Sequence, residues 1–164
     1  MKAKDLVLLS LLTAILFVGQ VALAFLPNIE VVSLLVIVYT LVFRKKVFYV
    51  IYAFALLEGI VYGFGLWWVM YLYVWSILAL VILLFKNNNS LIIWVIISGG
   101  FGLLFGTLCS IPYFIIGGWG LGFSYWIQGL PFDILHGLGN MVVTLLLFNP
   151  CYKALKTYNK MSIV

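Results

Sequence analysis

Long apolar runs, separated by short polar or glycine-rich breaks, fill almost the whole chain. Pro27-Asn28 interrupts the first part of the sequence, Gly63-Phe64-Gly65 the second, and Pro112 with the glycines of 117–122 the third. A helix needs roughly 20 apolar residues to cross the hydrocarbon core of a bilayer. The pattern therefore predicts an all-α integral membrane protein, with residues 1–164 forming a single domain. Its six expected transmembrane helices span approximately residues 5–26, 30–43, 47–64, 66–85, 91–115 and 128–149.

The composition agrees with a location in the bilayer. Of 164 residues, 66% are hydrophobic and only 8% are charged, which is too little polar material to cover a soluble domain of this size. The apolar run 6–26 follows Lys2 and Lys4, but it is too long for a typical signal peptide and lacks a cleavage site, so we expect a retained first helix. Cys109 and Cys151 have no metal or redox spacing, and we interpret them as apolar filler.

The basic residues indicate the orientation of the chain. Six spans place every lysine and arginine on one side, which the positive-inside rule makes cytoplasmic, whereas five or seven spans would divide the set. We therefore expect both termini in the cytoplasm and the protein in a bacterial plasma membrane. The basic residues are Lys2, Lys4, Arg44, Lys45, Lys46, Lys86, Lys153, Lys156 and Lys160.

The second expected span is too short to cross the membrane alone. Residues 31–43 would be about 20 Å long as a helix, against a hydrocarbon thickness of about 30 Å. The preceding segment 27–30 should therefore dip to membrane depth, which is tolerated only where protein or a wet cavity surrounds the backbone.

Small residues recur every four positions in two of the expected helices. Ser98, Gly102, Gly106 and Ser110 form such a ladder in the fifth span, where we expect close packing within the chain. Ser10 and Ala14 have the same spacing in the first span, where a partner protein is an open alternative.

Three of the four acidic residues fall in the outer half of the predicted bundle. Glu30, Glu58 and Asp133 have no basic residue at their level, and a charge near the bilayer centre costs about 2.5–3.5 kcal/mol on insertion scales. Asp133, His136 and Asn140 are spaced to share one helix face. This face forms either a self-satisfied polar cluster or the wall of a pocket.

Aromatic residues gather at the same level. A belt facing the lipid headgroups explains part of them, but not the acids, the histidine and the amides among them. We predict an outward-facing cavity for a neutral or weakly basic ring compound, with the glycine-rich loop 117–126 as its lid. The expected substrate-binding residues are Glu30, Glu58, Tyr62, Trp68, Tyr71, Trp119, Tyr125, Trp126, Gln128, Asp133, His136 and Asn140.

Motifs for several other activities are missing from the sequence. It has no Walker A loop, so the chain cannot drive pumping alone, and it has no H-E-x-x-H or G-x-S-x-G motif. We expect no enzymatic activity, no cofactor, no metal site and no nucleic-acid partner.

The chain resembles the substrate-binding S components of energy-coupling factor (ECF) transporters, which import vitamins into bacteria. The resemblance rests on the chain length, the six expected spans, the start "KDLVLLSLLTAILFVGQ", the hairpin "FLPNIEVVSLLVIVYTLVF" and the Gly/aromatic segment before "GLPFDILHGLGN". It implies capture of a vitamin or vitamin precursor from outside. It also implies a transmembrane coupling subunit and two ATP-binding subunits as partners. The family's small-residue docking motif corresponds here to Ser10 and Ala14.

Two other functions stay open at this point. One is a membrane-embedded enzyme that uses Asp133 and His136 as an acid/base pair. The other is an autonomous small-molecule carrier or an assembly factor, and uptake without ATPase partners would favour the carrier.

Overall fold

Helices make up nearly all of the described chain. The computed structural model describes residues 3–161, so the expected cytoplasmic Lys2 lies outside the described residues. The elements are α1 Ala3–Leu23, α2 Val32–Phe43, the 3-10 turn η1 Arg44–Lys46, α3 Val47–Tyr62, α4 Leu66–Leu84 and α5 Leu91–Met161.

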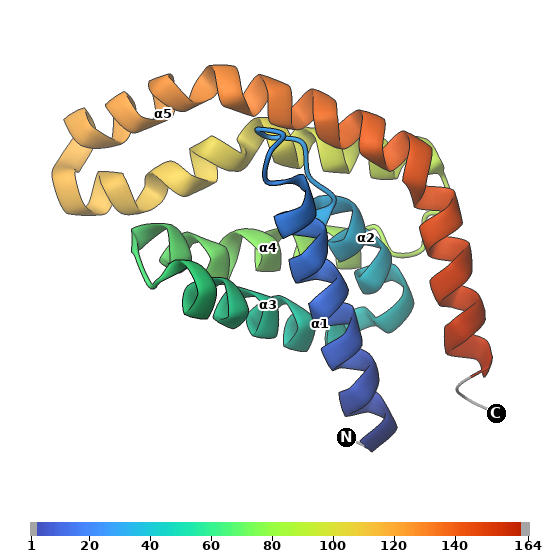
Figure 1. Ribbon diagram of the computed structural model, residues 1–164. Coiled ribbons are helices and arrows are strands. Elements are labelled where there is room, and N and C mark those ends of the chain that lie inside the picture. Colours follow the sequence, from blue (N-terminus) through green and yellow to red (C-terminus); the bar gives the residue numbers. More distant parts are fainter. Residues whose placement is uncertain (1–2, 162–164) are drawn as a thin grey trace.

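Helix α5 is folded back on itself. Gly118 has φ 68° and ψ −168°, a conformation outside the helical region that glycine adopts readily. The first arm (91–117) and the second arm (119–161) run side by side from this bend, which extends beyond the turn between α3 and α4 (Figure 1). The prediction of a loop over residues 117–126 is therefore wrong, because only Gly118 leaves the helical conformation.

Helix α2 lies at the centre of the molecule. Ten of its twelve residues are buried, and it packs against α1, α3, α4 and α5. Its length of 12 residues corresponds to about 18 Å, so it is shorter than the expected span. The other helices therefore shield α2 from the surroundings along most of its length.

The small-residue ladder of the first arm packs against the second arm. A Cβ atom on Gly102 would lie 2.8 Å from the Cα and N atoms of Gly137, and one on Gly106 would collide with the Asp133 carboxylate. Only glycine permits such an approach of two backbones. The internal packing expected for this ladder is confirmed.

Proline residues do not end α5 where the sequence suggested. A proline has no N–H group, so Pro112 leaves the Leu108 carbonyl without its helical donor. The Tyr73 hydroxyl of α4 donates to this carbonyl at 2.8 Å. The helix also continues through Pro131 and Pro150, past the expected end at residue 149, and its C-terminal part turns away from the hairpin (Figure 1).

The Tyr73 contact gives a first testable expectation. Tyr73→Phe removes the donor and leaves the Leu108 carbonyl unsatisfied, which should lower the free energy of unfolding by about 1–3 kcal/mol. Thermal unfolding in detergent micelles measures the effect. Tyr62→Phe is the matched control, because Tyr62 is 54% exposed and should tolerate the change. Equal stability of both variants would contradict the bridging role of Tyr73.

Three helices in the described part of the chain are long and apolar enough to cross a membrane. They are α1, α4 and α5, whose apolar windows are only 22–33% buried within the protein. The structure thus supports an all-helical membrane protein, while the number of spans and their orientation stay predictions. At the end that holds η1, Lys46 forms an ion pair of 2.9 Å with Asp5.

Candidate functional site

The connection between α1 and α2 contacts the second arm of α5 far from the bend at Gly118. Asn28 adopts a positive φ of 61°, and its carbonyl oxygen and the Ile29 side chain lie against Gly139 of the second arm. His136, which contacts Glu30, is 18 residues from the Gly118 bend, a distance of about 27 Å along a helix. The connection therefore lies at an intermediate depth of the hairpin (Figure 1), with Asn28, Ile29 and Glu30 half-buried and residues 24–27 exposed.

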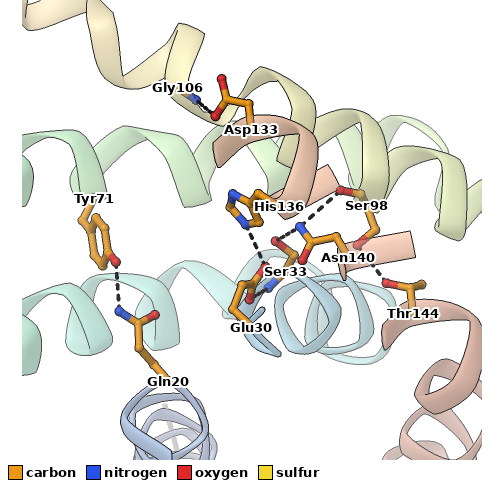
Figure 2. Close-up of polar contacts among 10 residues, drawn as sticks. All are labelled: Gln20, Glu30, Ser33, Tyr71, Ser98, Gly106, Asp133, His136, Asn140 and Thr144. Carbon is orange, nitrogen blue, oxygen red and sulfur yellow. Dashed lines mark hydrogen bonds and ion pairs between the residues drawn. The ribbon is translucent and has the colours of Figure 1, made fainter. Parts of the chain in front are cut away.

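Glu30 is the central residue of a polar cluster. One carboxylate oxygen accepts the backbone N–H of Ser33 in the first turn of α2 at 2.8 Å, where negative charge is favourable. The other lies 3.3 Å from Nε2 of His136. Figure 2 shows these contacts bringing the connection, α2 and the second arm together.

The cluster continues along the buried face of the second arm. Asn140 donates through Nδ2 to the Ser33 hydroxyl at 3.1 Å and to the Ser98 carbonyl at 3.4 Å. Thr144 donates to the Ser98 hydroxyl at 2.8 Å (Figure 2). Asn140 also carries a buried Oδ1 atom without a hydrogen-bond partner. Most of the cluster is thus hydrogen-bonded within the protein, and the residue that orients His136 is Glu30, not Asp133.

Two cavities lie beside this cluster. The smaller, of about 250 Å³, lies between the α1–α2 connection, α4 and α5, and Gln20 of α1 also reaches it. Gln20 donates to the Tyr71 hydroxyl at 2.9 Å (Figure 2). The larger, of about 440 Å³, lies mainly between the two arms of α5. Asn28 and Phe105 line both cavities, so the two adjoin at these residues.

Asp133 lines the larger cavity with an incompletely bonded carboxylate. Its Oδ1 atom accepts the backbone N–H of Gly106 at 2.9 Å, whereas its Oδ2 atom is buried and has no hydrogen-bond partner. Tyr125 lines the same cavity and stacks on Tyr113 with ring centroids 4.0 Å apart. The cavity therefore combines aromatic walls with a buried acceptor, a combination suited to a small organic molecule.

The structure brings seven of the predicted site residues to this region. They come from the α1–α2 connection, α4 and the second arm of α5. Six of them line a cavity, and Asn140 belongs to the polar cluster. The seven are Glu30, Tyr71, Tyr125, Gln128, Asp133, His136 and Asn140.

Five predicted site residues line neither of these two cavities. Trp68 donates to the Ala55 carbonyl and joins α4 to α3, and Trp126 donates to the Thr107 hydroxyl and joins the two arms of α5. Glu58 is 2% exposed on α3, and its Oε1 atom has no partner. Tyr62 and Trp119 are 54% and 76% exposed at the ends of their helices. These five residues were included because they were expected at the same depth in the membrane. Equal depth does not decide which side chains point into a cavity.

The two predicted docking residues lie on the outer side of α1. Ser10 and Ala14 are exposed, and the helix packs mainly against α3. Ser10 also lines an apolar groove between α1 and α3. Val7 and Leu11 extend the exposed apolar face along α1.

Several residues of the site were not found from the sequence. Gln20, Ser33 and Thr144 are single polar residues in apolar runs, which was the only available signal. Asn28 was noted only as part of the break at Pro27-Asn28. Phe105 was one apolar residue among many in the fifth expected span. Asp133 and His136 were considered as an acid/base pair, but they do not bond to each other. Asp133 accepts the Gly106 N–H, and His136 contacts Glu30.

The described residues contain no group of three His, Cys, Asp or Glu side chains arranged to hold a metal ion. No known protein family, curated protein or solved structure matches this chain.

Proposed function

We propose that this chain is the substrate-capturing membrane subunit of an ATP-driven importer of the ECF type. In this proposal it binds a vitamin or vitamin precursor from outside, and a coupling subunit with two ATP-binding subunits delivers the ligand to the cytoplasm. The observation that carries the proposal is the pair of adjoining cavities beside the buried Glu30–His136 contact and Asp133.

The size and the walls of the cavities support a small-molecule ligand. Sites for such ligands commonly have volumes of about 300–1,000 Å³, mostly apolar walls and a few polar groups, and the larger cavity of about 440 Å³ meets this description. Two carboxylates buried in an apolar protein are costly. Ligand recognition gives a reason for retaining them.

The proposal includes six membrane spans, formed by α1, α2, α3, α4 and the two arms of α5. The short α2 is compatible with this arrangement, because Asn28, Ile29 and Glu30 of the preceding connection pack against the second arm of α5, so protein covers this part of the backbone. The basic segment 44–46, Lys86 and the two termini would then all face the cytoplasm.

The partner subunits would dock on the exposed face of α1. This face is apolar, and the small side chains of Ser10 and Ala14 let another helix approach closely. Only 22% of the apolar window of α1 is buried within the protein, so this face is open to another helix as well as to lipid.

Mass spectrometry of the purified protein tests the proposed function. The chain is extracted in detergent from cells grown on rich medium, and bound small molecules are identified after denaturation. We expect a stoichiometric vitamin or vitamin precursor. A protein that holds no compound, and takes up none from a metabolite extract, would contradict the proposal.

A substitution on α1 separates docking from ligand binding. Ala14→Leu should reduce uptake by at least tenfold, because the larger side chain prevents close helix approach, while ligand binding to the isolated chain stays unchanged. Uptake by cells with the ATPase partners and ligand retention by the purified variant are measured together. Ala154→Leu makes the same change at an exposed position of α5 and should leave both unaffected. Normal uptake by the Ala14 variant would refute the docking assignment.

A further inference from the structure

One oxygen of the Asp133 carboxylate lacks a hydrogen-bond donor. Asp133 is 5% exposed, and the Gly106 N–H bond fixes one carboxylate oxygen on the first arm. The other oxygen, Oδ2, is buried and has no partner, while Asp133 itself lines the larger cavity. A buried acceptor without a donor is unfavourable, so a donor supplied by a bound molecule would stabilise the site.

Within residues 3–161, which the structure describes, no basic side chain donates to Oδ2 of Asp133. The sequence has no lysine or arginine between Lys86 and Lys153. Arg44 and Lys46 contact Lys86 and Asp5, far along the chain from the cavity residues. The nearest basic group on the same helix, His136, directs Nε2 to Glu30 rather than to Asp133 (Figure 2). A protonated ligand would supply the donor that Oδ2 lacks.

We propose that the larger cavity binds a small molecule whose protonated nitrogen donates to Oδ2 of Asp133. The apolar body of this molecule would lie against Phe132 and Tyr125, which line the same cavity, and an ion pair in a site of low polarity is strong. This inference rests on the proposed function, because it names the chemical class of the substrate: a compact organic cation with an apolar or aromatic body.

Two matched probes test the charge requirement directly. Phenethylamine and 2-phenylethanol have the same size and the same aromatic body, and only the amine carries a positive charge. Binding is measured by isothermal titration calorimetry on the full chain in lipid nanodiscs. We expect the amine to bind at least tenfold more tightly than the alcohol.

Variants assign the preference to Asp133. Asp133→Asn keeps an oxygen for the Gly106 N–H and should remove the preference for the amine. Asp5→Asn neutralises a carboxylate at the η1 end of the bundle and should keep it. Gly129→Leu fills the cavity from a position where a Cβ atom meets open space, and should weaken amine binding at least tenfold even if the Asp133 variant does not fold. Equal affinities for the two probes, no binding of either, or a preference that survives in Asp133→Asn would overturn the proposal.

The co-purified compound distinguishes this inference from the proposed function. A bound neutral or acidic vitamin would leave the importer subunit standing and overturn the cation site. A protein that holds and takes up no compound would end both.

Discussion

Gly102→Ala is expected to destabilise the protein by about 2–3 kcal/mol, the upper part of the range for overpacking a tight interior. The added methyl group would lie 2.8 Å from Cα and N of Gly137 and from the carbonyl carbon of His136. These are backbone atoms, which cannot rotate away as a side chain could. The two arms of α5 would have to separate, and the His136 backbone would move with them. Ligand binding should therefore weaken together with stability.

Gly100→Ala is the matched control, two residues away on the same arm. A Cβ atom there meets nothing within 4 Å, so the substitution should stabilise the helix by up to about 1 kcal/mol through its higher helix propensity. Unfolding by denaturant in micelles compares both variants with the original chain. A Gly102 variant as stable as the Gly100 variant would show that the arms do not approach closely at this point.

Much of the helical architecture could be predicted from the apolar runs. The boundaries expected near residues 47, 66 and 91 agree with the starts of α3, α4 and α5. The break expected at the glycines of 117–122 is present at Gly118, where the helix folds back, but Pro112 was misread, because local rules treat an internal proline as a break. The structure keeps the helix through Pro112 with a hydroxyl from α4, and such a distant compensation leaves no local signal.

The candidate site was predictable only in part, for a similar reason. Helix geometry alone places Asp133, His136 and Asn140 on one face, and the structure buries all three. The rotation of a helix about its axis depends on its neighbours, so Tyr62 and Trp119 could not be recognised as exposed. The partners of the cluster come from the α1–α2 connection, whose depth depends on the packing of several helices.

Glu30→Ala is expected to lower the free energy of unfolding by about 3 kcal/mol, near the lower limit for breaking a buried pair. The substitution removes the acceptor for both the Ser33 N–H and His136. The side chains of Glu30 and His136 are only 15% and 7% exposed, so water would compensate little of the loss. The α1–α2 connection would also lose its anchor beside both cavities, and ligand binding should weaken. Denaturant unfolding and ligand retention are measured on the same preparation.

A double-mutant cycle isolates the Glu30–His136 contact from the other effects of each substitution. His136→Ala also removes a ring that packs on Phe105 with centroids 4.9 Å apart, so its total cost exceeds the contact itself. We expect a coupling of about 1–3 kcal/mol between the two positions, as for residues in direct contact. The same cycle on Lys46 and Asp5, whose side chains are 50% and 31% exposed, should give at most about 1 kcal/mol. Equal couplings for the two pairs would mean that burial does not strengthen the Glu30–His136 contact. The connection would then need another anchor, with its contacts to Gly139 as the first candidate.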